Sequence, residues 1–153
     1  SWIVGKKPSV IGAATGAVAG LVAITPAAGF VGPMPALIIG IGAGIICYLA
    51  VELLLKLNID DALAVFGVHG IGGVWGALAT GLFVGIGFGT LDVGRGEQVL
   101  NQIIAIVATL VWSFVATSLI LLAIKYTIGL RAEESDEQAG LDQSVHGEEA
   151  YTS

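Results

Sequence analysis

Residues 36–57 read ALIIGIGAGIICYLAVELLLKL, an apolar run whose two charged residues, Glu52 and Lys56, lie near its end. A hydrocarbon core of roughly 30 Å requires about 20 apolar residues of helix, so this run is long enough to cross a bilayer. The chain of 153 residues is 56% hydrophobic and only 12% charged, where a soluble domain has roughly a quarter of charged residues. Its mean hydropathy is +0.92. The sequence therefore predicts an all-α, polytopic membrane protein.

Three more apolar stretches have the length of a membrane span. We expect four transmembrane helices, over residues 8–25, 36–57, 61–86 and 99–128. The Gly- and Pro-rich segment 26–35 predicts a non-helical connection near the membrane surface, and 87–98 predicts a polar loop.

The expected spans have recognisable start and stop signals. Asp60 and Asp61 stand where they can cap the third helix and favour the positive end of its dipole. Gly129 is a plausible stop for the fourth. Residues 1–130 then form the transmembrane region, and residues 131–153 form an acidic tail.

Charge is concentrated in that tail. Its seven acidic residues face one base, Arg131, so it carries the net charge of −6 of the whole chain. The remainder is neutral, which leaves no basic patch for a nucleic acid. A single cysteine, Cys47, excludes an intrachain disulfide and a cysteine-based metal site. No protease motif is present, and we expect no enzyme, no cofactor and no metal.

Basic residues predict the orientation in the cell membrane. Four spans put both chain ends and the 57–60 turn on one side, which carries Lys6, Lys7, Lys56, Lys125 and Arg131. The other side carries only Arg95. By the positive-inside rule, both termini are expected to be cytoplasmic. We expect no cleavable signal peptide.

Glycines recur four residues apart in three of the spans. Such faces allow helix backbones to approach closely in lipid, although small residues are common in all polytopic membrane proteins. The repeats are Gly12, Gly16 and Gly20; Gly40 and Gly44; and Gly72 and Gly76.

His69 is the most informative polar residue. It follows Asp61 by eight positions, which places it roughly 12 Å along the third span, near the bilayer midplane. An ionisable residue at that depth is a functional-site hypothesis, against the alternative of a neutral imidazole bonded to a neighbouring helix. Glycines on both sides of it leave room for a small solute, and a neutral imidazole offers one donor and one acceptor. It could also carry a proton.

Other polar and aromatic residues favour structural roles. Lys56 follows Glu52 by four positions, which favours an interfacial ion pair. Thr25, just before Pro26, can bond its own backbone. Trp112 is expected to be buried in the fourth span as a packing residue, and Trp75 could either pack or line a pore.

The stretch 60–76, DDALAVFGVHGIGGVWG, resembles the DDxxxVFGVHGxGGxxG signature of the ammonium transporters of the Amt/Mep/Rh superfamily. Residues 16–29, GAVAGLVAITPAAG, are similar to the span and external turn that precede it in the family. The tail, from GLR at 129–131 to GLD at 140–142 and SVHGEEAY at 144–151, resembles the family's GLR...GLDxSxHGExAY ending. The HGExAY ending favours the Amt branch over an Rh-type relative that handles ammonia or carbon dioxide.

The resemblance implies that this chain is the C-terminal portion of an eleven-helix transporter built from two inverted repeats, which assembles as a homotrimer. The first repeat, with its own pore histidine, would lie in the remaining N-terminal part. His69 would be the second pore histidine and proton-relay group, Val65 a pore-wall residue beneath it, and Thr25 a polar group in the external half. Many relatives have an aspartate in place of Ala64, so a vestibule role for that acid does not carry over.

The resemblance also implies a mechanism and a partner. The family recruits ammonium outside, removes its proton, and passes ammonia along the histidines while the proton follows by a relay. In the family, PII-type signalling proteins block the cytoplasmic exit, so an ammonium-sensing or regulator-docking module is the alternative function. The tail residues that match the family ending are Arg131, Asp142, His146, Glu148 and Tyr151. Composition alone would instead support a disordered acidic end.

Overall fold

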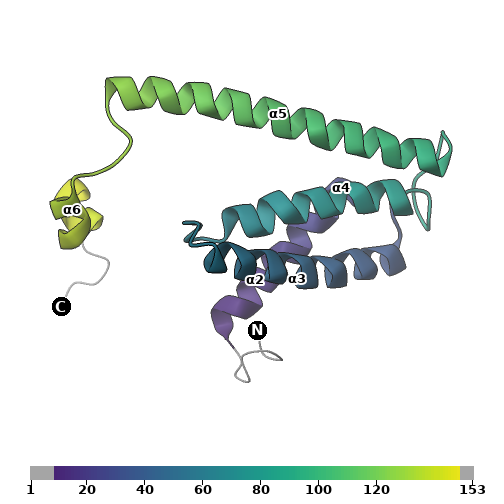
Figure 1. Ribbon diagram of the computed structural model, residues 1–153. Helices are drawn as coiled ribbons and strands as arrows, with labels where there is room; N and C mark the ends of the chain where they lie inside the picture. Colours follow the sequence, from purple (N-terminus) through teal and green to yellow (C-terminus); the bar gives the residue numbers. More distant parts are fainter. Residues whose placement is uncertain (1–8, 149–153) are drawn as a thin grey trace. The chain divides into compact units, whose positions relative to one another are not determined.

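The computed structural model describes residues 9–148, and the labels used below are those of Figure 1. All regular structure within this range is helical, which confirms the all-α prediction. Four helices there are long and apolar enough to cross a membrane: Val10–Ala27, Pro33–Lys56, Phe66–Phe83 and Arg95–Thr127.

Helix α2 (Val10–Ile24) begins at a side-chain cap, because the Ser9 hydroxyl accepts a hydrogen bond from the Gly12 amide at 3.1 Å. It ends in a short 3₁₀ turn, η1 (Thr25–Ala27), at Pro26. A proline has no amide hydrogen to continue the α-helical ladder. Pro8, the first residue of the expected span, lies outside the described range.

Helix α3 (Pro33–Lys56) begins with a proline in its first turn, a position that needs no amide donor. The connection after α2 is therefore shorter than the expected 26–35, because η1 occupies its start and α3 its end. Two backbone hydrogen bonds join what remains to the loop after α4. The Gly32 amide donates to the Ile86 carbonyl at 2.7 Å, and the Gly85 amide donates to the Phe30 carbonyl at 3.1 Å.

The third spanning helix is a π-helix, η2 (Phe66–Gly70), continued by α4 (Ile71–Phe83). It begins later than the expected residue 61 because Ala64 has a left-handed backbone with φ of 54°, which interrupts a right-handed helix. It ends before the expected residue 86, since Val84 is extended and Gly85 has φ of 80°.

Helix α5 (Arg95–Thr127) has 33 residues and begins four residues earlier than the expected 99. It ends at Thr127, and Gly129 follows as the predicted stop, where φ is 84° and the glycine amide donates to the Ile124 carbonyl at 3.0 Å. The chain divides within this helix into two compact units, Ser1–Ala108 and Thr109–Ser153.

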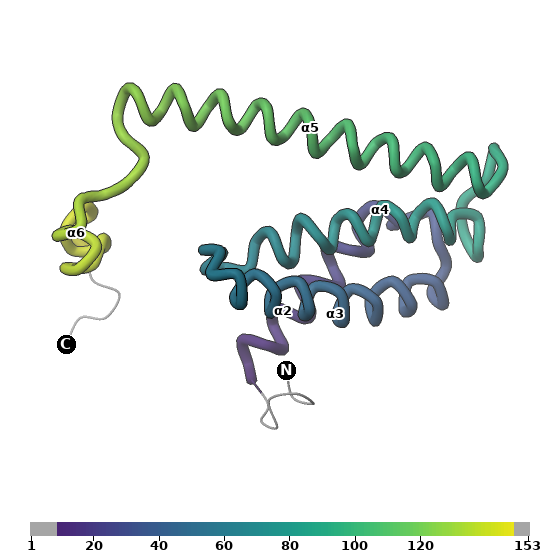
Figure 2. The backbone as a smooth tube through the Cα atoms, viewed as in Figure 1, coloured from purple at the N-terminus to yellow at the C-terminus, as the bar shows by residue number. Residues whose placement is uncertain are grey.

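In the first unit, α2, α3 and α4 contact one another. Figures 1 and 2 show α3 and α4 side by side and antiparallel, with α2 crossing behind them. Its core is formed mostly by small residues. One cluster contains Ala23, Ala27, Val31, Ile39, Ala43 and Ala79, and a second contains Ala19, Cys47 and Val68.

The glycine faces behave differently from one another in this core. A Cβ built on Gly76 would lie 3.0 Å from the Cα of Ala23, and one on Gly72 would lie 3.0 Å from the Cys47 sulfur. At both glycines a neighbouring helix therefore packs closely. A Cβ on Gly16, Gly20, Gly40 or Gly44 would meet no atom within 4 Å, so these faces are open within the described chain.

The second unit contains the acidic tail, with helix α6 (Glu134–Ala139) and the π-helix η3 (Asp142–His146) in contact with each other. Gly140 and Gly147 turn the chain with φ of 96° and 66°. The Ser144 hydroxyl donates to the carbonyls of Asp136 and Gly140 at 3.3 and 3.1 Å, which joins the two pieces.

Candidate functional site

His69 lies in the π-helix at the start of the third spanning helix. Its side chain is exposed on the surface of this chain and hydrogen-bonds to nothing in the part that the structure describes. The alternative considered from the sequence, an imidazole bonded to a neighbouring helix, is therefore not formed by residues 9–148. Isolated π-turns within α-helices frequently mark functional sites.

Asp61 caps the start of this π-helix. Its carboxylate accepts hydrogen bonds from the backbone amides of Val65 at 2.7 Å and of Gly67 at 3.1 Å. These amides belong to the first turn, which has no intrahelical partners of its own. The sequence indicated capping by an aspartate, but not that the cap would span a left-handed residue, Ala64, before the helix begins.

Val65 and Phe66 precede His69 by about one turn and are both exposed, at 52% and 56%. The Phe66 ring lies against Gly70, where a Cβ would be 3.1 Å from the ring. The exposed face around His69 thus carries apolar side chains and a glycine, which offer no competing charge.

The neighbours of His69 on the opposite side are buried against α3. Val68 is 3% exposed, and its carbonyl accepts a hydrogen bond from the Cys47 thiol at 3.8 Å. A Cβ on Gly67 would lie 2.6 Å from a Val51 methyl. Sequence analysis did not identify Cys47 and Val51 as relevant to His69, because their contacts join segments distant in the chain.

Thr25 lies in η1, which packs on α4, whereas the π-helix of His69 packs on α2, α3 and α4. The Thr25 hydroxyl donates to the Leu21 carbonyl at 2.7 Å, as the backbone-bonding interpretation predicted. The lone pairs of its oxygen can still accept a hydrogen bond.

The two tryptophans have different environments. Trp75 packs in the core of the first unit, where its indole nitrogen donates to the Ile39 carbonyl at 3.0 Å and its ring covers Gly42. It is a packing residue. Trp112 is 75% exposed, so the expectation that it is buried is wrong for this chain, because α5 has no buried residue in the described part.

The expectation of an ion pair between Glu52 and Lys56 is wrong, because the two side chains do not pair in the structure. Within residues 9–148 the ion pair lies in the tail, between Arg131 and Glu137 at 2.8 Å. Lys56 is the last residue of α3 and exposed, so water solvates its ammonium and little is gained by pairing.

The tail residues singled out from the sequence lie in the second unit and are exposed as far as described. Arg131 donates two hydrogen bonds to the Glu137 carboxylate, at 2.8 and 2.9 Å. Asp142 and His146 bound the π-helix η3, and Glu148 donates its amide to the Asp142 carbonyl at 2.9 Å. Tyr151 lies outside the described residues. The described range contains no group of three His, Cys, Asp or Glu side chains that could hold a metal ion.

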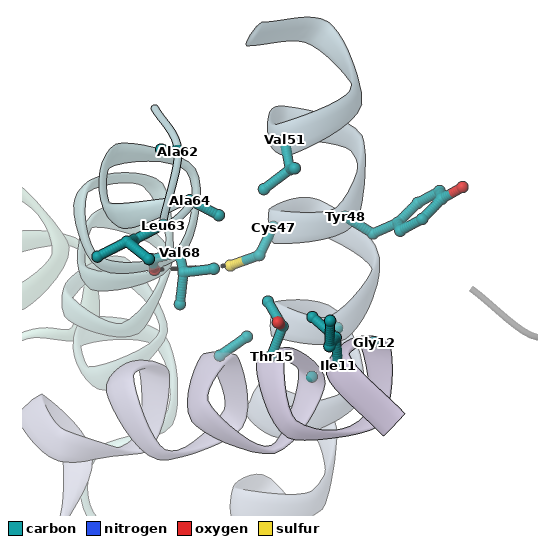
Figure 3. Close-up of a pocket in the computed structure, with 13 residues that line it drawn as sticks. Ile11, Gly12, Thr15, Cys47, Tyr48, Val51, Ala62, Leu63, Ala64 and Val68 are labelled. Atoms are coloured by element: carbon teal, nitrogen blue, oxygen red, sulfur yellow. Dashed lines mark hydrogen bonds between the residues drawn. The ribbon is translucent and has the colours of Figure 1, made fainter. Parts of the chain in front are cut away.

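An apolar groove of about 510 Å³ lies between α2, α3 and the 62–68 segment, and Figure 3 shows residues that line it. Its lining includes Thr15, Cys47, Tyr48 and Val68, but not His69, Val65 or Thr25. The groove is therefore separate from the exposed face of His69.

Comparisons with known proteins identify the family of this chain. Residues 1–151 match the sequence model of the Ammonium Transporter Family. The ammonium transporter of Bacillus subtilis (strain 168) is 49% identical over 156 residues, which cover 98% of this chain and 39% of that protein. Ammonium transporter Amt1 of Archaeoglobus fulgidus is 43% identical, with coverage of 99% and 39%.

Solved structures of similar proteins have the same fold over this chain. The structure described as "Sensor Amt Protein" aligns with a TM-score of 0.83 at 31% identity, covering 95% of this chain and 36% of that one. Mep2 of Saccharomyces cerevisiae aligns with a TM-score of 0.73 at 36% identity, covering 88% and 36%. The chain spans about two fifths of the length of the curated relatives it matches, and it belongs to the ammonium transporter family.

Proposed function

We propose that this chain is the C-terminal portion of an ammonium transporter and forms one wall of its conduction route, with His69 as a pore-lining group. The observation that carries the proposal is the exposed imidazole of His69, which has no hydrogen-bond partner in the described chain and lies on a helix of membrane-spanning length. An intramembrane ionisable residue requires a partner. A transported solute, together with residues of the missing part, would supply it.

Electrostatics favour passage of ammonia over passage of the cation. Burying ammonium in an apolar lumen costs several kcal/mol or more, whereas a neutral solute pays far less. A neutral imidazole at His69 provides one hydrogen-bond donor and one acceptor without adding a fixed charge. The proton left behind would then follow by a relay in which His69 takes part.

Val65 and Thr25 complete the proposed route on this chain. Val65 is exposed near His69 and would form part of the apolar wall. Thr25 follows the C-terminal end of α2, and its hydroxyl oxygen would accept a hydrogen bond from the solute in the external half. Conduction needs the remaining N-terminal part and assembly as a homotrimer, so the chain alone in liposomes should conduct nothing.

Substitution of His69 tests the central assignment. In the complete transporter, His69→Ala should change methylammonium uptake, ammonium current or potassium competition while the amount in the membrane stays the same. Leu110→Ala, at a 52% exposed position of α5, is the comparison for a lost apolar side chain. Unchanged transport and selectivity in His69→Ala would contradict the assignment.

The proposed orientation has both termini of this chain on the cytoplasmic side, as the basic residues predict. Single cysteines at positions 9 and 140, introduced into a variant without Cys47, should be labelled from the same side. Labelling of the two positions from opposite sides would contradict four spans with both ends inside.

A regulatory role of the tail is the second candidate function. Two observations support it: the double hydrogen bond between Arg131 and Glu137, and the Ser144 bonds that join α6 to η3. These contacts order a segment that composition alone would leave disordered. The tail, with Asp142, His146 and Glu148, would then dock on the cytoplasmic side or bind a PII-type regulator.

Deleting residues 132–153 tests this second function. Membrane insertion should persist, while uptake is reduced or no longer regulated. Wild-type transport and unchanged regulator binding after the deletion, with rapid amide exchange throughout the tail, would identify an inert acidic end.

A further inference from the structure

The direction in which His69 projects depends on the backbone that carries it, because its ring has no hydrogen-bond partner in the described chain. That backbone is a π-helix, a conformation that is rare and seldom persists without support. The contacts that hold Phe66–Gly70 in place therefore determine where the imidazole stands.

Two residues of α3 contact the buried side of this π-helix. Cys47 and Val51 are four positions apart, so they lie on one face of α3, a turn from each other. The Cys47 thiol donates to the Val68 carbonyl at 3.8 Å, and both residues are buried, at 2% and 3% exposed. In Figure 3 the Cys47 sulfur points at the Val68 segment, and Val51 projects from the next turn toward the same chain segment.

Two glycines on either side of His69 permit this close approach. A Cβ on Gly67 would lie 2.6 Å from the Val51 methyl, and a Cβ on Gly72 would lie 3.0 Å from the Cys47 sulfur. The first distance is shorter than real Cβ atoms show, and the second is tighter than most Cβ contacts, so a side chain at either position requires the helix or its α3 neighbour to move. The two contacts together hold the helical turn between Gly67 and Gly72 in one position against α3.

We infer that Cys47 and Val51 are positioning residues for His69: through Gly67, Val68 and Gly72 they set where the imidazole projects, although neither side chain faces it. The inference rests on the proposed function of His69 in conduction. It adds that selectivity depends on the packing of α3 against the π-helix.

The test is made in the complete transporter: one substitution adds a methyl group on one side of the contact, and a second removes the atom that it meets. Gly72→Ala places a methyl against the Cys47 sulfur, so ammonium conduction should fall on the order of tenfold, with a changed ratio of ammonium to potassium current. Cys47→Ala removes that sulfur, and the double variant should return to within about twofold of Cys47→Ala alone. Residues that are in contact or otherwise coupled show such non-additivity, whereas the effects of distant, independent sites add.

A second pair covers the case in which Gly72→Ala does not reach the membrane. Gly67→Ala collides with the Val51 methyl, whereas Val51→Ala leaves the new Cβ only ordinary contacts, at 3.4 Å to the Val51 amide nitrogen and 3.5 Å to Leu54. The control is Gly96→Ala, in the first turn of α5, where a Cβ meets no atom within 4 Å and both current and selectivity should stay as in the wild type.

The position of His69 is also measured without transport, by side-chain NMR of its imidazole in the same variants. Gly72→Ala should shift the imidazole signals, and the Cys47→Ala/Gly72→Ala pair should return them toward those of Cys47→Ala. Unshifted signals with a wild-type current ratio in Gly72→Ala, or no relief in either double variant, would overturn the positioning role. Shifted and restored signals together with wild-type transport in His69→Ala would instead contradict the proposed function of His69 and leave the structural coupling standing.

Discussion

The indole nitrogen of Trp75 on α4 donates a hydrogen bond to the carbonyl oxygen of Ile39 on α3 at 3.0 Å. Ile39 is fully buried, and the Trp75 ring lies over Gly42, where a Cβ would be 2.6 Å from it. This pair joins the two antiparallel helices (Figure 1). It therefore connects the helix that carries the His69 π-turn to the one that carries Cys47 and Val51.

Replacement of Trp75 by phenylalanine should lower stability. The substitution removes the hydrogen bond to Ile39 and leaves the ring pocket over Gly42 partly filled, so the expected loss is about 1 kcal/mol from the hydrogen bond and a similar amount from packing. Thermal unfolding of the purified transporter in detergent measures it. Trp112→Phe, at a 75% exposed position, is the matched control, and an equal loss in both variants would contradict the role assigned to Trp75.

Asp61 should be required for the π-helix that holds His69. Asp61→Ala removes the acceptor for the Val65 and Gly67 amides, and hydrogen bonds to a charged group contribute about 2 kcal/mol. Amide exchange at Val65 and Gly67 should accelerate, and Asp61→Asn should have a smaller effect because one acceptor oxygen remains. Asp60→Ala is the control, since Asp60 is exposed and makes no hydrogen bond within the described residues. Slow exchange retained in Asp61→Ala would show that the cap is dispensable.

Glycine at position 64 should stabilise the transporter. Ala64 has φ of 54°, a left-handed conformation that costs an alanine roughly 1–2 kcal/mol and a glycine almost nothing. Part of the gain is lost to the greater freedom of glycine in the unfolded chain, so Ala64→Gly should add at most about 1 kcal/mol. Chemical denaturation compares the two, with Ala62→Gly, at an exposed neighbouring position, as the control. Equal destabilisation by both substitutions would contradict the strain at Ala64.

Arg95 should stabilise the junction between α4 and α5. Its guanidinium donates to the Leu82 and Val84 carbonyls, and these groups are at the negative end of the α4 dipole. Arg95→Gln should accelerate amide exchange of Gly85 and Ile86 by about tenfold, which corresponds to roughly 1.4 kcal/mol. Exchange at Ala43, in the core of the first unit, is the internal reference. Unchanged exchange at Gly85 would mean that the loop is held without the arginine.

The tail contact between Arg131 and Glu137 should depend on pH in a defined direction. Hydrogen bonds from Arg131, together with its positive charge, hold the pKa of the Glu137 carboxyl below the ordinary value for glutamate. The pair is therefore fully formed above that ordinary value and is lost as the pH falls through the lowered pKa. A carboxyl NMR titration of Glu137 in the full chain measures this, and Arg131→Gln should raise its pKa. The same titration curve with and without Arg131 would contradict the pair.

The sequence by itself determined the membrane-spanning helices, because spanning depends on the length of an apolar run and not on its neighbours. It also determined where α5 stops, since Gly129 just after its end adopts positive φ without a Cβ penalty. His69 stood out for a similar reason, since an ionisable residue within an apolar run is costly wherever the helix packs.

Only the tertiary structure decided which of several equivalent residues make contact. Gly72 and Gly76 pack against other helices, while Gly16 and Gly20 repeat with the same spacing and meet no atom of the described chain. Trp75 is a packing residue and Trp112 is exposed, although both lie in apolar helices. The physical reason is that close packing and hydrogen bonding depend on segments distant in sequence. Local periodicity sets which residues share a helix face, whereas the helix that approaches that face is chosen by the fold.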